Sequence, residues 1–435
     1  MNKWATGIVL VGILCVIGFS CSSGKTDPVT DQMLYALLEG KDYFRLRDKM
    51  AETKDKLSQE RTMYYQAMLD HAFNRCEESN TRIEQLLGMP SVHKVDSLVS
   101  ELLQVKVGNL TRMNRYRETS ITLRQLIEMT DPVADSSDYA DFVNMEGLWS
   151  AVAEVPPTEI HKHGNVEIDS YRDSHDMLMV PVRSGGAADE FVFDTGAGLS
   201  TVTESVARTM GMTLYDTDVE AGTTGEKIRT KLAVADSIYL GDLLVENVLF
   251  LMVPDEALSF PEANFEIRGI IGFPVMLAME EIHMQKNGKL SIPGEPGQRN
   301  FSNLYLETLS PSVQLISGPD SLIFTLDTGA TQTEISKRYY DNHKERIDAT
   351  GRRSTSRRGY VGGIREVEEI ILENFPFRIG SKEGVLPEAT VVMEEFSFLE
   401  NSDGNLGQDV FSQFDVMILN FRSMYVDFES YSKSN

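Results

Sequence analysis

The stretch Phe191-Val192-Phe193-Asp194-Thr195-Gly196-Ala197 ends an apolar run on an aspartate, a threonine and a glycine. The same order returns in Phe324-Thr325-Leu326-Asp327-Thr328-Gly329-Ala330. Each apolar run predicts a strand that delivers its aspartate into an apolar setting, and Thr-Gly then predicts a turn. One such tripeptide can be a plain strand-to-turn transition, because Asp and Gly favour turns. Two copies, each behind an apolar run and each followed by alanine, indicate an internal duplication.

The distance from each aspartate to a later glycine repeats as well. Gly272 follows an apolar pair and lies 78 residues after Asp194 (272 − 194), and Gly407 follows a leucine and lies 80 residues after Asp327 (407 − 327). A glycine-rich stretch and two further strand-like runs separate these points in both copies. The chain therefore contains one small β domain twice.

These motifs resemble the aspartic protease superfamily, specifically its retropepsin-like branch as found in bacterial proteins. In that family each lobe contributes one Asp-Thr-Gly, a glycine-rich flap hairpin and a late apolar-apolar-Gly strand that packs against the aspartate loop. The resemblance covers about residues 172–430. It implies two retropepsin-like β-barrel lobes that form a pepsin-like pseudo-dimer, with Asp194 and Asp327 as the catalytic pair.

The resemblance also implies roles for the residues around this pair. Threonines cross-bond the two loops, glycines admit backbone amides to the carboxylates, and the late glycines leave room for the aspartate loops. These dyad-supporting residues are Thr195, Gly196, Thr328, Gly329, Gly272 and Gly407. The flap and substrate-binding candidates are Thr223, Thr224, Gly225, Tyr360 and Gly362. Tyr360 can equally be an ordinary hairpin side chain.

Two adjacent carboxyl groups can hydrolyse a peptide bond without a metal or a covalent nucleophile. They share one proton, because both cannot be ionised comfortably at a separation of a few ångströms. The charged carboxylate takes a proton from water and the protonated one donates to the carbonyl oxygen, with neither role fixed to one aspartate. Ala197 and Ala330 stand where pepsin-like enzymes often have a stabilising hydroxyl, so we expect a weakly acidic to neutral optimum. We expect no metal and no cofactor.

Several residues depart from the family pattern. Gly198 stands where Thr331 stands in the second copy, and a polar residue is usual there. Asn405 replaces the first apolar residue of the second late motif, and Pro274 occupies the place of Asp409. None of these changes removes a catalytic atom, but together they keep open a degenerate protease that only binds.

The N-terminus is typical of a secretory signal. Residues 1–21 combine a short basic start, an apolar run and small residues that end at Cys21, where a bacterial lipoprotein carries its lipid. An ordinary signal peptide or an uncleaved anchor is the alternative. Cys15 leaves with the signal and Cys21 carries the lipid, so Cys76 alone remains and we expect no intrachain disulfide.

Residues 28–152 predict a helical-repeat domain, because apolar residues recur there at helical spacing. Residues 73–79 match residues 113–119 at an offset of 40 (113 − 73), and Lys41-Asp42-Tyr43 is a fainter third copy. Repeated helix pairs look like a tetratricopeptide-type array, although the usual period is nearer 34 residues and its signature residues are mostly missing. Such a stack offers a concave surface to a peptide or protein partner, and the alternative is a stalk or packing platform.

Two polar segments predict linkers. Residues 153–171 separate the helical domain from lobe 1, which spans residues 172–292. The Pro- and Gly-rich residues 293–300 separate lobe 1 from lobe 2, which spans residues 301–430. Three histidines, His161, His163 and His175, lie near the first linker, and their spacing matches no metal site.

The charge of the chain argues against some partners. A net charge of −25 disfavours nucleic acid and electrostatic adhesion to an acidic membrane face. Four arginines beside the second flap form a basic cluster, either a solvated loop or a site for an acidic substrate segment: Arg352, Arg353, Arg357 and Arg358.

The sequence as a whole predicts a lipid-anchored aspartic peptidase of the bacterial cell envelope, periplasmic or surface-facing. Its partners are then a peptide or protein substrate, the membrane and a protein held by the helical domain. The alternative is a catalytically degenerate lipoprotein that binds peptides or acts as a scaffold. A third possibility is a processing enzyme that cuts one cognate partner.

Overall fold

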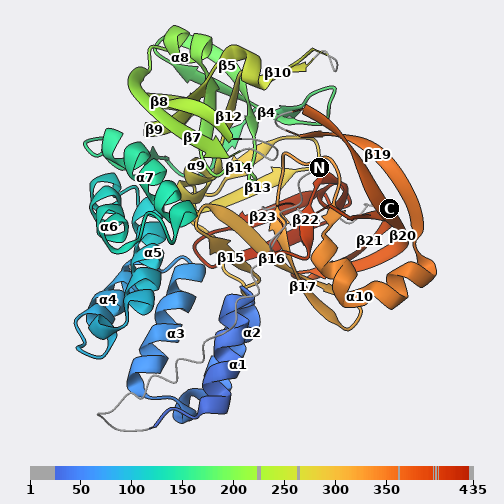
Figure 1. The fold of residues 1–435 in the computed structure, drawn as a ribbon. Helices are drawn as coiled ribbons and strands as arrows, with labels where there is room; N and C mark the ends of the chain where they lie inside the picture. The colour runs from blue at the N-terminus through green and yellow to red at the C-terminus, as the bar shows by residue number, and fades with distance from the viewer. Residues whose placement is uncertain are drawn as a thin grey trace, which may run out of the picture.

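The computed structural model describes residues 25–222, 227–261, 265–360, 363–394, 396, 399 and 401–430. Helices come first, and β-rich units follow (Figure 1). Cys21 and the flap candidates Thr223, Thr224, Gly225 and Gly362 lie outside these ranges. Within them, none of the helices combines the length and the apolar composition that crossing a membrane requires.

The helical region consists of three helix pairs and a last single helix. The pairs are α1 (Pro28–Glu39) with α2 (Tyr43–Thr53), α3 (Gln59–Ala72) with α4 (Cys76–Leu87), and α5 (Asp96–Arg112) with α6 (Tyr116–Met129); α7 (Ser136–Ala151) follows. The turn within each pair holds one residue of positive φ: Lys41 (56°), Asn74 (59°) and Asn114 (55°). Asn adopts this backbone region more readily than most residues. The sequence repeat at an offset of 40 therefore marks turns between paired helices.

The first lobe is built on one large sheet. Its strand order is β1-β9-β6-β12-β5-β4-β8-β7, with β3 beside β4. The strands are β1 (Glu159–His161), β3 (Tyr171–Arg172), β4 (Leu178–Ser184), β5 (Ala187–Phe193), β6 (Ser200–Thr203), β7 (Thr213–Gly222), β8 (Lys227–Leu240), β9 (Leu243–Val253) and β12 (Gly269–Ile271). The short helices α8 (Glu204–Thr209) and α9 (Phe273–Ala278) and the small hairpin of β10 (Ser259–Phe260) and β11 (Phe265–Glu266) complete the lobe.

The second lobe repeats this plan with its own sheet, in the order β15-β16-β17-β22-β18-β21-β20-β19. The strands are β15 (Leu304–Glu307), β16 (Ser310–Ser317), β17 (Asp320–Leu326), β18 (Glu334–Ile335), β19 (Arg352–Tyr360), β20 (Gly363–Ile379), β21 (Lys382–Val392) and β22 (Gly404–Leu406). The helices are α10 (Lys337–Thr350) and α11 (Gln408–Phe411).

A third sheet joins the two lobes. Its order is β2-β14-β13-β23-β24, from β2 (Val166–Ile168), β13 (Glu281–Gln285), β14 (Leu290–Ile292), β23 (Val416–Asn420) and β24 (Tyr425–Glu429). The two lobes are bonded where β13 pairs antiparallel with β23. The segment expected to be a linker at residues 153–171 differs from that expectation. Its strand β1 pairs with β9 and its strand β2 pairs with β14. The sequence did not indicate β2, because the buried Val166 and Ile168 alternate with the exposed Glu167 over too few residues to show a strand pattern.

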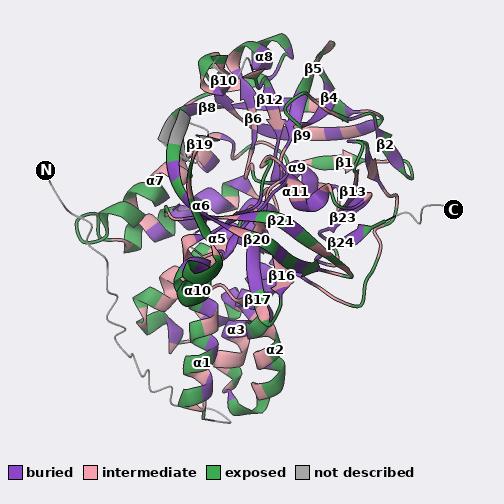
Figure 2. Cartoon of the chain, turned by 90° about the vertical axis from the view of Figure 1, so that its right-hand side faces the viewer, coloured by how far each residue is buried: buried purple, intermediate pink, exposed green. Residues whose placement is uncertain are grey.

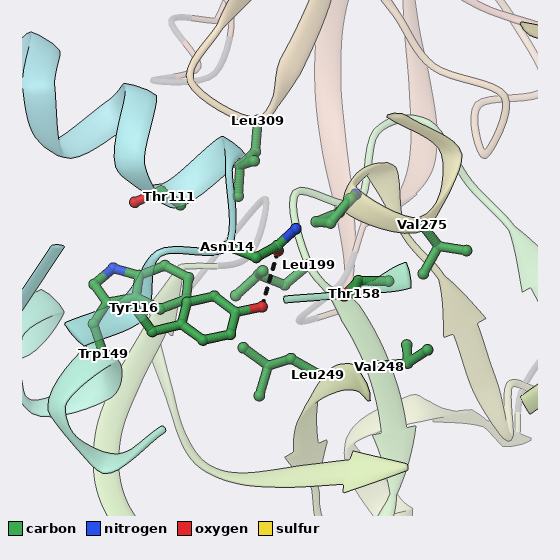
Figure 3. A pocket seen from close by; sticks show the side chains of 11 residues that line it. Thr111, Asn114, Tyr116, Trp149, Thr158, Leu199, Val248, Leu249, Val275 and Leu309 are labelled. Atoms are coloured by element: carbon green, nitrogen blue, oxygen red, sulfur yellow. Dashed lines mark hydrogen bonds between the residues drawn. The ribbon is translucent and has the colours of Figure 1, made fainter. Parts of the chain in front are cut away.

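The helical region packs against both lobes. Tyr116 stacks on Trp149 with ring centroids 5.3 Å apart, and both belong to an apolar cluster that includes Leu249 of β9. On the second lobe, Phe44 meets Tyr305 edge-to-face at 5.3 Å. Figure 2 shows that buried residues line the sheets of both lobes and also lie in the helices. Figure 3 shows the small cavity at the first of these contacts, which holds about 10 Å³, room for about one water molecule.

Candidate active site

The two Asp-Thr-Gly turns occupy equivalent places at the ends of β5 and β17. The amide of Asp194 donates to the carbonyl oxygen of Ile271 on β12 at 3.1 Å, and the amide of Asp327 donates to the carbonyl oxygen of Leu406 on β22 at 3.1 Å. Both strand pairs are parallel, so each late strand lies beside the strand that delivers the aspartate. Both aspartates are half-buried and remain partly open to solvent.

The threonines lock the two turns to each other. The amide of Thr195 donates to Oγ1 of Thr328 at 3.0 Å, and the amide of Thr328 donates to Oγ1 of Thr195 at 3.0 Å. Each hydroxyl then donates across the lobe boundary, Thr195 to the Leu326 carbonyl at 2.7 Å and Thr328 to the Phe193 carbonyl at 3.0 Å. Both threonines are buried, so these four bonds fix the separation of the turns.

The two glycines bring each turn against the opposite carboxyl group. A Cβ atom on Gly196 would lie 2.8 Å from Cγ of Asp327, and a Cβ atom on Gly329 would lie 2.7 Å from Cγ of Asp194. Real Cβ atoms do not come this close to other heavy atoms. The glycines are therefore required because the aspartate of the other lobe fills the space of a side chain.

The late glycines are crowded by the loops that follow the aspartates. A Cβ atom on Gly272 would lie 2.6 Å from the backbone of Leu199, and one on Gly407 would lie 2.5 Å from the backbone of Gln332. Their amides donate to hydroxyls of those loops, Gly272 to Ser200 at 3.0 Å and Gly407 to Thr333 at 3.0 Å. Of the six residues named from the sequence, the two threonines and the two turn glycines thus lie at the aspartate turns, and the two late glycines pack against the loops that follow them.

Burial is the largest cause that raises the pKa of Asp194, and the charge of Asp327 is the next. Amides of Gly196 and Gly329 act in the opposite direction, and the pKa still rises to about 8. This raised pKa favours a proton on Asp194 at neutral pH. Such a pair can hold a water molecule, accept its proton and donate another to a polarised carbonyl oxygen.

Residues 180–275 match the family model described as aspartyl protease. This segment is similar to aspartyl proteases. The matched segment runs from β4 into α9 and includes the Asp194 turn and Gly272, which confirms the family expected from the sequence. No curated protein sequence matches the chain.

Solved structures that resemble this chain do so at low sequence identity. The basic 7S globulin from soybean is 12% identical, with a TM-score of 0.39, covering 62% of this chain and 96% of its own. Conglutin gamma from lupine seeds is also 12% identical, with a TM-score of 0.40 and the same coverage. A retropepsin-like aspartic protease from Rickettsia conorii is 15% identical, with a TM-score of 0.22, covering 32% of this chain and 94% of its own.

Asn405 is a site residue that the sequence analysis noted only as a departure from the aspartyl protease pattern. Its Nδ2 atom donates to Oδ2 of Asp327 at 2.8 Å. The signal in the sequence was the polar residue itself, at the position where the first copy has Ile270. The partner of the Asn405 side chain depends on the register of the paired strands, which the sequence motif does not specify.

The segments expected to form flaps lie at the ends of two long hairpins. The β7–β8 hairpin leads to residues 223–226, and the β19–β20 hairpin pairs the backbone of Tyr360 with Gly363 around residues 361–362. In the arginine cluster, Arg352 bonds Glu388 at 3.2 Å and Arg353 bonds Asp348 at 3.1 Å. These two arginines therefore already have acidic partners within the chain.

The first hairpin is held by the helical region. The side-chain amide of Asn144 on α7 donates to the carbonyl oxygen of Glu220 at 2.8 Å and accepts from its amide at 2.8 Å. This pair of bonds mimics a neighbouring strand at the outer edge of β7. Helix α7 thus braces the hairpin close to its tip.

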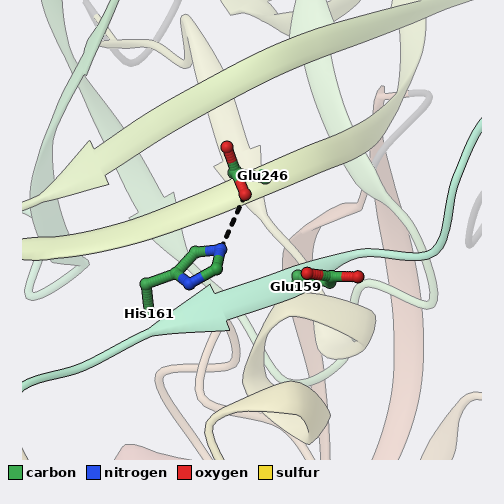
Figure 4. Close-up of side chains that lie close together, drawn as sticks. All are labelled: Glu159, His161 and Glu246. Carbon is green, nitrogen blue, oxygen red and sulfur yellow. Dashed lines mark hydrogen bonds and ion pairs between the residues drawn. The ribbon is translucent and has the colours of Figure 1, made fainter.

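The sequence predicted that His161, His163 and His175 do not form a metal site. Within the described residues, one group has the composition of a cation site, formed by Glu159 and His161 on β1 with Glu246 on β9 (Figure 4). His161 Nε2 lies 2.6 Å from Glu246 Oε2, and both side chains are well exposed. The contact is an exposed hydrogen bond across two paired strands.

Proposed function

We propose that the protein is an aspartic endopeptidase whose two lobes pair as a pepsin-like pseudo-dimer, with Asp194 and Asp327 as the catalytic dyad. The observation that carries this proposal is the reciprocal threonine bonding of the two turns. It sets one carboxyl group from each half of the chain against the glycine of the other. A binding protein has no evident need for two carboxyls that share a proton, whereas peptide hydrolysis does.

In the proposed mechanism, a water molecule sits between the carboxyl groups and attacks the carbonyl carbon of a bound peptide. The ionised aspartate takes a proton from the water while the protonated one gives its proton to the carbonyl oxygen, which forms a gem-diol. The C–N bond then breaks, and the amine leaves with the proton that the first aspartate took. The second aspartate recovers a proton from a diol hydroxyl, so the pair ends with the one proton with which it began.

We further propose, from the sequence alone, that Cys21 carries a lipid and tethers the protein to a membrane of a bacterial cell envelope. The helical region, whose paired helices favour a tetratricopeptide-like array, would then hold a protein partner or substrate near the dyad. The second candidate is a lipoprotein that binds peptides without cutting them. The family departures at Gly198 and Pro274 favour it, because both weaken the support of the first turn.

The test compares the protein with its Asp194→Asn and Asp327→Asn variants. Each is incubated from pH 4 to 8 with a diverse peptide mixture and with a cell-envelope extract, and new termini are identified by mass spectrometry. Asp242→Asn, the same change in an exposed turn, is the matched control. We expect cuts with the protein and the control, and a loss of about 100- to 10,000-fold in both dyad variants.

Cuts that appear only with the envelope extract would indicate a processing enzyme with one cognate partner. Folded protein that makes no dyad-dependent cut on either substrate would leave the binding protein as the better assignment.

A further inference from the structure

The supports of the two aspartates differ at one equivalent position. In the first lobe, Val192 on β5 pairs with Ile270 on β12, and both belong to an apolar cluster. In the second lobe, the pair is Thr325 on β17 and Asn405 on β22. Asn405 is buried, so a polar pair replaces an apolar one beside Asp327 alone.

Asn405 joins Thr325 to Asp327 through its side-chain amide. Its Oδ1 atom accepts a hydrogen bond from the Thr325 hydroxyl at 2.5 Å, and its Nδ2 atom donates to Oδ2 of Asp327 at 2.8 Å. An ionised carboxylate can only accept hydrogen bonds, so this orientation of the amide is the one that matches an ionised Asp327, whereas the opposite orientation would need a proton on Asp327.

Asp327 then has donors on both of its oxygens. The amides of Gly329 and Ala330 donate to Oδ1 at 2.9 and 3.0 Å, and Asn405 occupies Oδ2. Ala330 has no hydroxyl to offer, so Asn405 supplies the side-chain donor that the turn itself lacks. Hydrogen bonds to the charged form of a carboxyl group stabilise that form.

Asp194 has no side-chain donor equivalent to Asn405 among the described residues, and backbone amides and the carboxyl group of Asp327 are its partners. The amide of Gly196 donates to its Oδ1 atom at 2.8 Å, and the amide of Ala197 donates to the backbone oxygen of Asp194 at 3.3 Å. Among the described residues, no side chain other than the carboxyl group of Asp327 bonds to the Asp194 side chain, and Ile270 stands where Asn405 stands in the second lobe.

We propose that Asn405 is a positioning residue that keeps Asp327 ionised and thereby leaves the shared proton on Asp194. Asp327 is then the base that takes the proton of water, and Asp194 is the acid that protonates the carbonyl oxygen; this refinement rests on the proposed peptidase function.

The first test is the pH dependence of kcat/KM for Asn405→Leu and Asn405→Asp in the full-length protein. Leucine has similar size without a donor, and aspartate keeps the Thr325 contact but presents a carboxyl group. Without the donor, the ionised form of Asp327 is less stabilised, so the acidic limb of the profile moves up by about one pH unit. Below that limb kcat/KM falls about tenfold, and on the plateau it changes little. Asn405→Asp moves the limb in the same direction.

The mirror variant Ile270→Asn places a donor beside Asp194 instead. It stabilises the ionised form of Asp194, so the basic limb moves to lower pH. Circular dichroism and urea unfolding establish which variants fold. A profile that moves in neither Asn405 variant, with both folded, overturns the proposal.

The second test does not need turnover. The carboxyl carbons of aspartate in the full-length protein are labelled with ¹³C and titrated by NMR, with assignments from Asp194→Asn and Asp327→Asn. We expect the protonated shift for Asp194 and the ionised shift for Asp327 between about pH 5 and 7. The reverse pattern overturns the proposal even if every Asn405 variant fails to fold. This pattern in a protein that cuts nothing would sustain the proton assignment while the peptidase function fails.

Discussion

The two lobes share the strand pairing that carries their aspartate turns and differ at their outer surfaces. At the dyad, Phe193 pairs with Ile271 in one lobe as Leu326 pairs with Leu406 in the other. Away from the dyad, the strands β8 and β9 of the first lobe are covered by α5–α7, whereas β20 of the second lobe is covered by its own helix α10. The comparison indicates that the strands at the aspartate turns keep the same pairing in both lobes. The residues on each outer face differ because different helices pack on them.

Alanine at the turn glycines should produce the largest effect and should strike both lobes equally. The added methyl group of Gly196→Ala or Gly329→Ala collides with the opposite carboxyl group, so we expect kcat/KM to fall by about 100-fold or more. Gly198→Ala is the matched control, because its methyl group would meet Leu309 at an ordinary 3.8 Å. Full activity in either turn variant would mean that the lobes separate more easily than the structure indicates.

Removing a cross-lobe hydroxyl tests whether the two turns contribute equally. Thr195→Val and Thr328→Val each lose one donor and one acceptor in a buried site, so we expect the free energy of unfolding to fall by about 2–4 kcal/mol. Urea unfolding gives the value. Thr209→Val, at an exposed helix end, should change it by less than about 0.5 kcal/mol. Unequal decreases in the free energy of unfolding would show that one threonine contributes more than the other to the contact between the lobes.

The pH dependence of stability should reveal the lobe that keeps the proton. The folded pKa of Asp194, about 8, lies above its ordinary value of 3.8, so the folded state binds a proton that the unfolded chain has released between these values. Stability therefore falls as pH rises from about 4 to about 8 and then levels off. Urea unfolding of Asp194→Asn should lack this slope, while Asp242→Asn should keep it. An unchanged slope in Asp194→Asn would place the proton elsewhere.

The brace on the first hairpin should give the smallest effect. Asn144→Ala removes two hydrogen bonds to the backbone of Glu220, so we expect hydrogen exchange of the Glu220 amide to accelerate about tenfold, equivalent to about 1.4 kcal/mol. Val143→Ala, an exposed change on the same helix, is the control. Hydrogen exchange at Val367 in the second hairpin should stay unchanged. Faster exchange at both hairpins would show that Asn144 stabilises more of the protein than the first hairpin.

The sequence was most informative where a residue type has few alternatives. The glycines, threonines and aspartates of both turns could be placed because one short geometry requires all of them. The repeat of Asn74 and Asn114 likewise marks turns that need a positive φ. The motif at Asn405 could be placed on a strand, but not its bond to a residue 78 positions away, because that bond depends on the register of two strands. The short strands within residues 153–171 escaped for a related reason, since three residues carry too little pattern.

The threonine bonds join residues 133 positions apart, and the sheet between the lobes needs β23, which lies later still. A growing chain that has reached only residue 300 therefore carries half of every cross-lobe pair and a single aspartate turn. Synthesis can proceed for more than a hundred residues past the first turn while the dyad does not yet exist. The two aspartate turns can therefore pair only after the second turn, at Thr328, has been synthesised.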